Sequence, residues 1–360
     1  MLTIPKNDGF YMPGEHEPQE EVWLGWPERT DTWPWGAKPA QMAFANVANT
    51  IVEFTKVTVC VSAQQYDNAR QQLNNNVRVL EMSMNDSWFR DTGPTYLVNG
   101  QGERRGVDWQ FNAWGGLLDG LYFPWDKDDA VAGKITNSYR DSIYRAPFVL
   151  EGGSIHSDGE GTIYTTKECL LHPSRNPDLS QDQIEDYLKQ FLGAEKVIWL
   201  ELGLYADDDT NGHVDNIMHV ARPGEIVLSW TEDKNDPQYA ISQHALELLQ
   251  SSTDAKGRNI EVHKLTLPKP LHIAPSEGLG FDACEGMVRE TGTRMAASYA
   301  NFLITNGLVL FPMLCEQSDT QAQRELQAIF PEHKIVGIPA RDILLGGGNI
   351  HCITQQIPLI

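Results

Sequence analysis

The residues best suited to chemistry in this sequence lie at its carboxyl end. Cys352 follows three consecutive glycines in the run Gly346–Cys352. Glycine backbone takes turn geometries that are closed to other residues and lets another molecule approach closely. A cysteine thiolate is a strong nucleophile, so this thiol is a candidate for covalent catalysis. A C-terminal turn followed by a buried structural cysteine fits the run equally well.

Three further polar clusters interrupt strand-like apolar patterns earlier in the chain, and each is flanked by glycine. They are Trp88–Pro94, Glu151–Gly153 and Asn211–Asn216. Side chains alternate between the two sides of an extended segment, so we expect His213 and Asp215 to point to the same side. A base and a carboxylate would then face the same space.

These clusters supply a strongly acidic set of side chains. If the side chains meet, three carboxylates, one imidazole and one thiol come together, namely Asp91, Glu151, Asp215, His213 and Cys352. Burying such a group is costly unless a cation joins it. A guanidinium fits because it is planar, permanently protonated and offers N–H pairs that carboxylates accept in bidentate fashion. We therefore expect two aspartates to fix its plane and present its central carbon to Cys352.

The arrangement predicts covalent catalysis on the guanidinium carbon. Cys352 attacks that carbon, and His213 protonates the departing nitrogen as ammonia. His213 then takes a proton from the water that attacks the thiouronium intermediate, while Glu151 orients and charges the imidazole. A thiol among carboxylates has a raised pKa and stays protonated. We therefore expect the arriving substrate cation to assist thiolate formation.

The composition limits the classes of partner. The chain has 360 residues, of which 41% are hydrophobic and 21% charged, and its formal net charge is −21. These proportions are typical of a folded globular protein. The negative charge argues against nucleic acid or an anionic membrane as a partner and favours a cationic ligand. A generic solubilising surface charge explains the acidity equally well.

The pattern of cysteines and the lack of long apolar segments indicate the cellular compartment of the protein. Five widely scattered cysteines fit neither a disulfide framework nor a zinc knuckle. The first residues lack an apolar core of signal-peptide length, and no stretch approaches the roughly 18 apolar residues of a membrane span. We expect a soluble, cytoplasmic protein with reduced thiols.

The elements that must position the clusters alternate along the whole chain. We expect one helix capped by Ser180 and stopped by Gly193, another opened by Asp236, and a third over 319–330, ended by Pro331. We expect strands at 57–61, 77–82, 148–150, 162–165, 197–200, 226–228, 302–304 and 334–338. No Gly/Ser linker or low-complexity tract marks a domain boundary.

The spacing of the clusters suggests internal repetition. Their centres at Asp91, Glu151, His213 and Cys352 lie 60, 62 and 139 residues apart. Five units of about 70 residues would fill the chain, and the missing cluster would fall at Tyr299–Phe302. Repeats place equivalent loops on one face, so the clusters could converge around a common centre. Accidental spacing is the alternative.

The clusters and their surroundings resemble the agmatine deiminase family of the guanidine-modifying superfamily over nearly the whole chain. The motifs that carry the resemblance are Met12–Glu15, Trp26–Pro27, Asn85–Pro94, Asp108–Gly116, Leu150–Gly159, His213–Asn216, Asn235–Tyr239 and Gly346–Gln356. Motifs this long do not recur by chance. One departure is His16, where the family often has Tyr, and it lies outside the catalytic set.

The resemblance implies an α/β pentein fold, a five-bladed propeller of ββαβ units with pseudo-fivefold symmetry around a central active site. One domain would span residues 1–360. The implied activity is hydrolysis of agmatine to N-carbamoylputrescine and ammonia, with no metal or other cofactor. The expected partner is a small cationic guanidino substrate, agmatine, with no nucleic acid and no membrane. A homo-oligomer, dimer or tetramer, is left open.

Carried over position by position, the resemblance makes Cys352 the nucleophile and His213 the general acid/base, paired with Glu151. The residues that would bind substrate, two gripping the guanidinium and one lining the channel for the alkyl tail, are Asp91, Asp215 and Trp88. The alternative is a deiminase or amidinotransferase acting on arginine or another guanidino compound, with the same carbon chemistry. A catalytically silent polyamine-binding protein is a candidate from another class.

Several residues near the clusters are expected to have other roles. The acidic run Tyr205–Asp209 could receive a terminal ammonium or be a solvated loop. Arg90 and His351 are expected to form structural contacts, because neighbouring strand side chains face opposite ways. We expect Cys169 to be a small apolar residue. His156 is expected to belong to a glycine-flanked turn, because no third metal ligand has suitable spacing.

Overall fold

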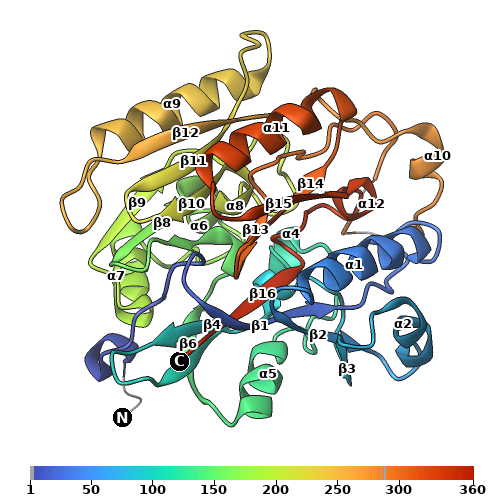
Figure 1. Ribbon diagram of the computed structural model, residues 1–360, viewed down its shortest axis with the longest axis horizontal. Coiled ribbons are helices and arrows are strands. Elements are labelled where there is room, and N and C mark those ends of the chain that lie inside the picture. Colours follow the sequence, from blue (N-terminus) through green and yellow to red (C-terminus); the bar gives the residue numbers. More distant parts are fainter. Residues whose placement is uncertain (1–3, 285, 288) are drawn as a thin grey trace.

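The computed structural model describes residues 4–284, 286–287 and 289–360. In this part of the chain five small sheets surround a common centre (Figure 1). Each sheet contains an antiparallel pair whose second strand also pairs in parallel with a third, and a helix links the two parallel strands. The expected five-bladed α/β propeller of ββαβ units is confirmed.

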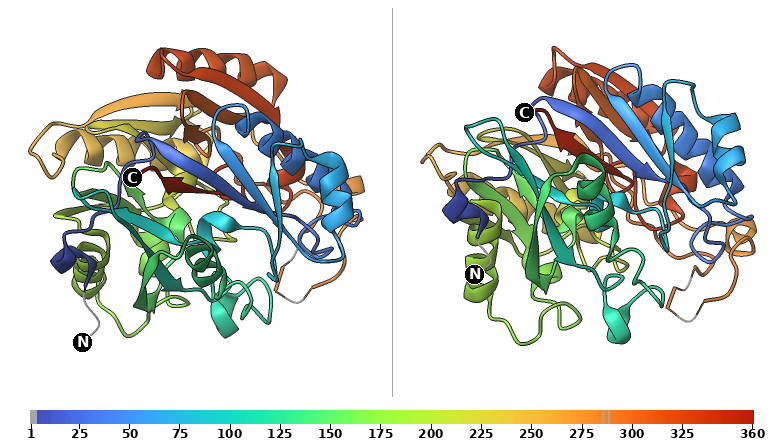
Figure 2. Two further views of the ribbon diagram at one scale, coloured as in Figure 1. Left: turned by 60° about the horizontal axis from the view of Figure 1, so that its bottom comes forward. Right: turned by 90° about the horizontal axis from the view of Figure 1, so that it is seen from below.

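The sheet that closes the propeller combines both ends of the chain. Its strands, in spatial order, are β16 (Thr354–Pro358), β1 (Gln19–Gly25), β2 (Lys56–Val61) and β3 (Arg78–Glu81). Its helices are α1 (Lys38–Ile51) and α2 (Tyr66–Gln72). The C-terminal strand β16 lies antiparallel beside β1, with Gln356 opposite Val22 (Figure 2). This pairing joins the last segment of the chain to the first blade.

The second and third sheets follow in sequence order. The second contains β4 (Thr95–Val98), β5 (Arg104–Gln110) and β6 (Ser142–Val149), with α3 (Phe89–Thr92), α4 (Gly116–Asp119) and α5 (Val131–Tyr139). The third contains β7 (His156–Ser157), β8 (Thr162–Thr166) and β9 (Lys196–Leu200), with the short 3-10 helix η2 (Gly152–Ser154), α6 (Lys167–Leu170) and α7 (Gln181–Leu192). A 3-10 helix near the amino end, η1 (Pro5–Asp8), packs against α7.

The fourth and fifth sheets complete the ring. The fourth contains β10 (Met218–Arg222), β11 (Glu225–Trp230) and β12 (Glu261–Thr266), with α8 (Val214–Ile217), α9 (Pro237–Ser251) and α10 (Pro275–Gly278). The fifth contains β13 (Leu303–Thr305), β14 (Leu308–Met313) and β15 (Lys334–Pro339), with α11 (Glu316–Ile329) and α12 (Arg341–Leu344). No helix of the described residues combines the length and apolar character needed to cross a bilayer.

Local sequence signals explain where several helices begin and end. Ser180 caps α7 through a capping box with Gln183, and Gly193 ends it in the left-handed conformation. Asp236 caps α9 by accepting a hydrogen bond from the N–H of Gln238. The helix expected over 319–330 is confirmed as α11, although it begins three residues earlier, at Glu316. The eight expected strands are present, seven of them within two residues of their predicted ends, whereas the strand expected at 148–150 begins six residues earlier as β6.

The helices that link parallel strands cover the outside of the ring (Figures 1 and 2). In α1 the apolar residues Ala40, Phe44, Val47 and Ile51 follow helical spacing and are at most 1% exposed. A short turn or helix precedes the first strand of every antiparallel pair, including α3 before β4, η2 before β7 and α8 before β10. These short segments turn toward the centre and carry the polar clusters there.

Candidate active site

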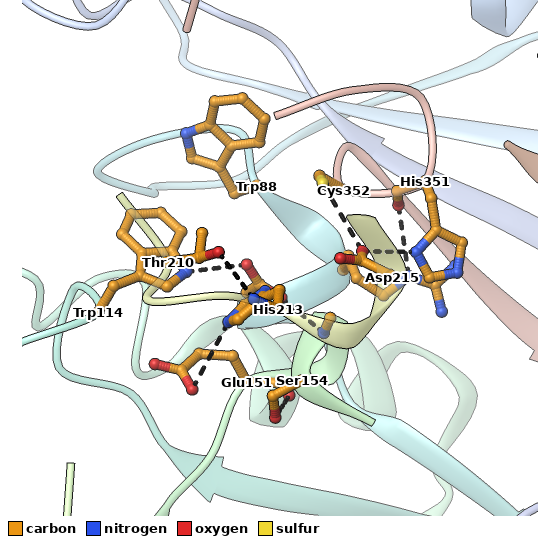
Figure 3. A network of polar contacts seen from close by, with 12 residues as sticks. Trp88, Trp114, Glu151, Ser154, Thr210, His213, Asp215, His351 and Cys352 are labelled. Atoms are coloured by element: carbon orange, nitrogen blue, oxygen red, sulfur yellow. Dashed lines mark hydrogen bonds and ion pairs between the residues drawn. The ribbon is translucent and has the colours of Figure 1, made fainter. Parts of the chain in front are cut away.

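Five turns bring the polar clusters together at the centre of the ring (Figure 3). Asp91 lies in α3, Glu151 precedes η2, and His213 and Asp215 lie at the start of α8. Cys352 lies in the turn before β16. All five of these predicted site residues are 5% exposed or less. The fifth turn, before β13, contributes Asn301, which the sequence analysis did not single out as a site residue.

The thiol of Cys352 is fixed by Asn301 and Asp215. The Asn301 Nδ2 atom donates to the sulfur at 3.1 Å, and the sulfur lies 3.6 Å from Asp215 Oδ2. The Asn301 Oδ1 atom also accepts the backbone N–H groups of His351 and Cys352. Burial, together with the negative charges of Asp215 and Asp91, raises the pKa of Cys352 well above its usual value. This shift favours the thiol over the thiolate at neutral pH.

The imidazole of His213 lies between two carboxylates. Its Nδ1 atom is 3.9 Å from Asp91 Oδ1, and its Nε2 atom is 3.9 Å from Glu151 Oε2. Neither ring nitrogen makes a hydrogen bond to a described residue. Burial alone would lower the pKa of His213, but Asp91, Cys169 and Glu151 raise it well above its usual value. This shift favours the protonated ring, which has a proton to donate.

An arginine missed by the sequence analysis holds Glu151. The Arg175 Nε atom donates to Glu151 Oε1 at 2.6 Å, and both side chains are fully buried. Arg175 also donates to the carbonyl of Thr210 and to Asn211 Oδ1, which lie three and two residues before His213 in the chain. The second carboxylate oxygen, Oε2, has no hydrogen-bond partner among the described residues. Glu151 is thus fixed on one side and turned toward the imidazole on the other.

The two aspartates are held by different kinds of donor. Asp91 accepts hydrogen bonds from the Trp114 indole at 2.9 Å and from the N–H of Gly153 at 2.8 Å, both of which are neutral. Asp215 Oδ2 lies 2.8 Å from the Nδ1 atom of His351, while its Oδ1 atom is unpartnered among the described residues.

The pKa values of the two aspartates shift in opposite directions. Burial raises the pKa of Asp91, and nearby Asp215 and Glu151 add to the rise, which His213 only partly offsets. Burial would also raise the pKa of Asp215, but the hydrogen bond and charge of His351 outweigh it, so the pKa of Asp215 is lowered. Asp215 therefore stays ionised more readily than Asp91.

A pocket opens onto the sulfur. The residues that line it are Trp88, Asp91, Trp114, Leu121, Asp209, Thr210, Met287, Gly346, Gly347, Gly348 and Cys352. The Trp88 ring stacks on Trp33, and its indole N–H donates to Asp86, so it forms a rigid wall. Neither lysine nor arginine lines this cavity within the part of the chain that the structure describes.

The glycines around the site leave room that side chains would fill. A Cβ atom at Gly348 would lie 2.6 Å from the Trp88 ring and 3.0 Å from the Cys352 sulfur. Gly347 has a φ of 111°, in the region that favours glycine. At Gly153 a Cβ atom would lie 2.6 Å from His213 Nδ1 and 2.9 Å from Asp91 Oδ1. The backbone itself therefore forms part of the site floor.

Two aspartates of the acidic run before His213, Asp207 and Asp209, have different roles. Asp207 is buried and accepts the backbone N–H of His213 and the amide of Asn216, so it fixes the start of α8. Burial raises the pKa of Asp207 to about 6. Asp209 instead lines the cavity, where Arg289 donates to both of its oxygens, at 3.0 and 2.7 Å.

One expectation about local geometry is wrong. His213 and Asp215 do not lie in an extended segment, because His213 occupies the N-cap position of α8 and Asp215 lies in its first turn. Both side chains nevertheless reach the same space, beside Gly153. Cys169 is buried in an apolar cluster, as expected, although its sulfur also lies within 4.8 Å of ligand atoms of Glu151 and His213.

Two expected structural roles are observed. The Arg90 NH1 atom donates to Glu15 Oε1 at 3.0 Å, and both side chains are buried. His351 points away from the cavity and makes hydrogen bonds to Asp215 and Glu15 (Figure 3). Of the residues that the sequence analysis missed, Asn301 had a detectable signal, because it falls in the missing repeat cluster at 299–302.

Two buried groups contain atoms that could serve as metal ligands. The first is Glu151, Cys169 and His213, and the second is Glu15, His156, His219 and His351. His156 therefore does have candidate co-ligands in space, contrary to the expectation from spacing. A metal suits the first group poorly, because the Arg175 guanidinium already occupies one Glu151 oxygen.

Known proteins resemble this chain along its length. Residues 11–358 match the family described as Porphyromonas-type peptidyl-arginine deiminase. A candidate agmatine deiminase from Photobacterium profundum is 59% identical over 360 residues, covering 100% of this chain and 99% of the relative. One from Vibrio parahaemolyticus is 58% identical over 358 residues, 99% of each chain. The solved agmatine deiminase of Enterococcus faecalis is 52% identical, with a TM-score of 0.97, and the match covers 99% of this chain and 98% of that one.

Proposed function

The chain belongs to the agmatine deiminase family, and from this premise and the site geometry we propose that it hydrolyses agmatine to N-carbamoylputrescine and ammonia. The observation that carries the proposal is the convergence of a thiol, an imidazole and three carboxylates beside one cavity, all 5% exposed or less. An acidic set of this kind is costly to bury without a cation. A guanidinium supplies that cation and an electrophilic carbon.

Asp91 and Asp215 bind the guanidinium. The unpartnered Oδ1 atom of Asp215 accepts one of its N–H groups, and Asp91 accepts from the other side. Trp88 and Trp114 enclose the alkyl chain in the cavity. Because both aspartates are fixed by other residues before the substrate arrives, little reorganisation is needed on binding.

The first half-reaction forms a carbon–sulfur bond. The positive charge of the bound guanidinium lowers the pKa of Cys352, whose thiol proton leaves for solvent. The thiolate then attacks the guanidinium carbon to give a tetrahedral adduct. The carbon–nitrogen bond breaks as His213 donates its proton to the departing nitrogen, which leaves as ammonia. An amidino-cysteine cation and a neutral imidazole remain.

The second half-reaction releases the product. Neutral His213 takes a proton from a water molecule as that water attacks the amidino carbon. The carbon–sulfur bond then breaks, the hydroxyl proton passes to the sulfur and N-carbamoylputrescine leaves. His213 is again a cation, and Cys352 is again a thiol. Glu151, held by Arg175, stabilises the charged imidazole in both halves. No step calls for a metal or other cofactor.

The cavity favours agmatine over arginine. Arginine differs from agmatine by one carboxylate, which needs a cationic partner when buried. The described lining contains no lysine or arginine, and nearby Arg289 is already paired with Asp209. Both oxygens of Asp209 are likewise engaged by Arg289, so the preference rests on the lack of an available cation for the arginine carboxylate. An arginine carboxylate would add a negative charge without a free partner.

Ammonia release from agmatine, arginine and a capped arginine peptide tests the proposal directly. We expect rapid release from agmatine alone and none in Cys352→Ser. Cys60→Ser is the matched control, because Cys60 is also a fully buried cysteine but lies in β2, away from the cavity. Unaltered turnover in Cys352→Ser would identify a different nucleophile. Turnover of arginine equal to that of agmatine would instead support the alternative function, a deiminase that acts on arginine.

Two broader properties belong to the same proposal. Residues 1–360 act as a single catalytic domain, since the first and last strands pair in one sheet. The protein works in the reducing cytoplasm, which is consistent with its five unpaired cysteines.

A further inference from the structure

A buried chain of polar contacts begins at Asp215 in the active site and leads away from the cavity to His351, Glu15 and Arg90. Asp215 Oδ2 lies 2.8 Å from His351 Nδ1, and His351 Nε2 lies 2.8 Å from Glu15 Oε1. Arg90 NH1 then donates to the same Glu15 oxygen at 3.0 Å. All four side chains are 5% exposed or less. The chain links elements from three different sheets, so the fold itself holds it together.

His351 is a cation in this arrangement. Each ring nitrogen lies within hydrogen-bond distance of a carboxylate, and carboxylates only accept hydrogen bonds, so both nitrogens carry protons. Burial and nearby Arg90 lower the pKa of His351, but Glu15 and Asp215 outweigh them and raise it.

The other groups that face His351 do not reverse this assignment. The rings of His156 and His219 lie with their centroids 5.1 Å from that of His351. Burial lowers the pKa of each, so both rings are neutral. Asn301, which accepts the backbone N–H of His351, carries no charge, and Cys352 is a thiol in the free protein.

We propose that Glu15 and His351 are positioning residues for the reaction, which keep Asp215 ionised and turn its Oδ1 atom toward the guanidinium. His351 occupies Oδ2 and leaves Oδ1 free for a substrate N–H group. Glu15 keeps His351 charged, and Arg90 keeps Glu15 ionised. The inference rests on the proposed role of Asp215 in the reaction.

A metal ion at the same place is a weaker explanation. Glu15, His156, His219 and His351 have ligand atoms within 4.8 Å of one another. However, His351 has both nitrogens committed to carboxylates, and the Arg90 guanidinium contacts Glu15 directly. A divalent cation would displace a proton from His351 and lie beside a second positive charge.

Glu15→Gln and His351→Asn test the inference through the pH dependence of kcat/KM. Gln cannot supply the negative charge that keeps His351 protonated, and Asn keeps a donor near Asp215 without the charge. In both variants we expect the acid limb, which Asp91 sets in the unmodified protein, to move up by about one pH unit or more, because Asp215 loses its cationic partner and its pKa then exceeds that of Asp91. Raising the pH should then restore much of the lost kcat/KM.

Glu21→Gln is the matched control. Glu21 is a buried glutamate of β1 that accepts hydrogen bonds from Thr58 and Tyr139. None of these three residues lines the cavity. A merely structural loss lowers stability in all three variants without moving the pH profile. If Glu15→Gln and His351→Asn leave the acid limb where it lies in the unmodified protein, the inference is wrong.

A measurement without turnover separates this inference from the proposed function. In 15N spectra of the histidine-labelled free protein, we expect His351 to have both ring nitrogens protonated at pH 7.5, with assignment by His351→Asn. A neutral His351 would contradict the inference even if agmatine is turned over. Stoichiometric metal in the purified protein, absent from Glu15→Gln, would also overturn it. Lack of agmatine turnover with a charged His351 would instead contradict the proposed function alone.

Discussion

At the scale of single residues, Asp91 and Asp215 differ in the groups that hold their carboxylates and therefore in pKa. Neutral donors hold Asp91, whereas the charged imidazole of His351 holds Asp215. The pKa of Asp91 is consequently raised and that of Asp215 lowered. We therefore expect Asp91 to be protonated first as the pH falls, with a loss of affinity for the substrate.

Replacing either aspartate by asparagine should weaken both binding and catalysis. The same contacts hold the substrate and the developing transition state, so KM rises and kcat falls together. We expect Asp91→Asn and Asp215→Asn each to lower kcat/KM by about 100-fold, the effect of unpairing a buried charge. Steady-state kinetics with agmatine measures the changes in KM and kcat separately. A change confined to KM would show that the contact acts in the ground state only.

The Cys352 thiol should be protonated in the free protein at neutral pH. Burial and the surrounding carboxylates raise its pKa, and in the proposed mechanism the substrate cation lowers it. Ultraviolet titration of thiolate absorbance, with Cys352→Ser as the reference, measures this. We expect no Cys352 thiolate at pH 7 without substrate. A stable thiolate in the free protein at that pH would contradict substrate-assisted activation.

Gly153→Ala should inactivate the protein without unfolding it. The added methyl group would lie 2.6 Å from His213 Nδ1 and 3.0 Å from Asp215 Oδ2. We expect kcat/KM to fall by about 100-fold or more as the site atoms are displaced. Gly133→Ala is the control: it lies in α5 with nothing within 4 Å of an added Cβ atom, so it should retain activity and add about 0.5–1 kcal/mol of stability. Equal activity of both variants would show that Gly153 does not limit the site.

At the scale of elements, the outer helices stabilise the fold and carry none of the proposed site residues. The helix α7 buries Ile184, Leu188, Phe191 and Leu192 against the third sheet, and its first turn depends on the Ser180 capping box. The short segments α3, η2 and α8 face inward and carry site residues instead. Changes in the two kinds of element should therefore have different effects.

Ser180→Ala should lower stability while leaving kcat/KM unchanged. Losing the cap leaves the N–H of Gln183 without its partner, which costs about 1 kcal/mol. Ser251→Ala, at the exposed end of α9, is the control and should change stability by less than about 0.5 kcal/mol. Urea unfolding curves measure both. A fall in turnover for Ser180→Ala at saturating agmatine would show that α7 is coupled to the site.

The closed ring of sheets is what brings the site residues together at the scale of the whole molecule. Cys352 lies two residues before β16, and β16 is held by β1 from the other end of the chain. Cys352, the proposed nucleophile, therefore reaches His213 and Asp91 only if the ring closes. Catalytic geometry and global folding depend on the same strand pair.

Ending the chain after Ile353 should abolish folding although every proposed catalytic residue remains. The truncation removes β16 and exposes one edge of β1, whose Val22, Trp23 and Leu24 are fully buried. Ending it after Pro358 removes only the exposed Leu359 and Ile360 and should be tolerated. Circular dichroism and urea unfolding compare the two. Cooperative unfolding of the shorter chain would show that closure is dispensable.

The sequence by itself determined the chemistry and much of the fold. Cys352, His213 and the acidic residues stood out because their types and glycine-flanked positions are local features. The caps of α7 and α9 were also readable, because capping depends on residues three or four positions apart. The spacing of the clusters, together with the family motifs, gave the five-unit propeller.

Only the tertiary structure decided which groups tune that chemistry. Arg175 meets Glu151, Asn301 meets Cys352, and Glu15 meets His351 across 24, 51 and 336 residues. No local pattern encodes such pairs, because closure of the ring sets the distance between them rather than their separation along the chain. The pKa shifts follow from those contacts and from burial, so they too exist only in the folded molecule.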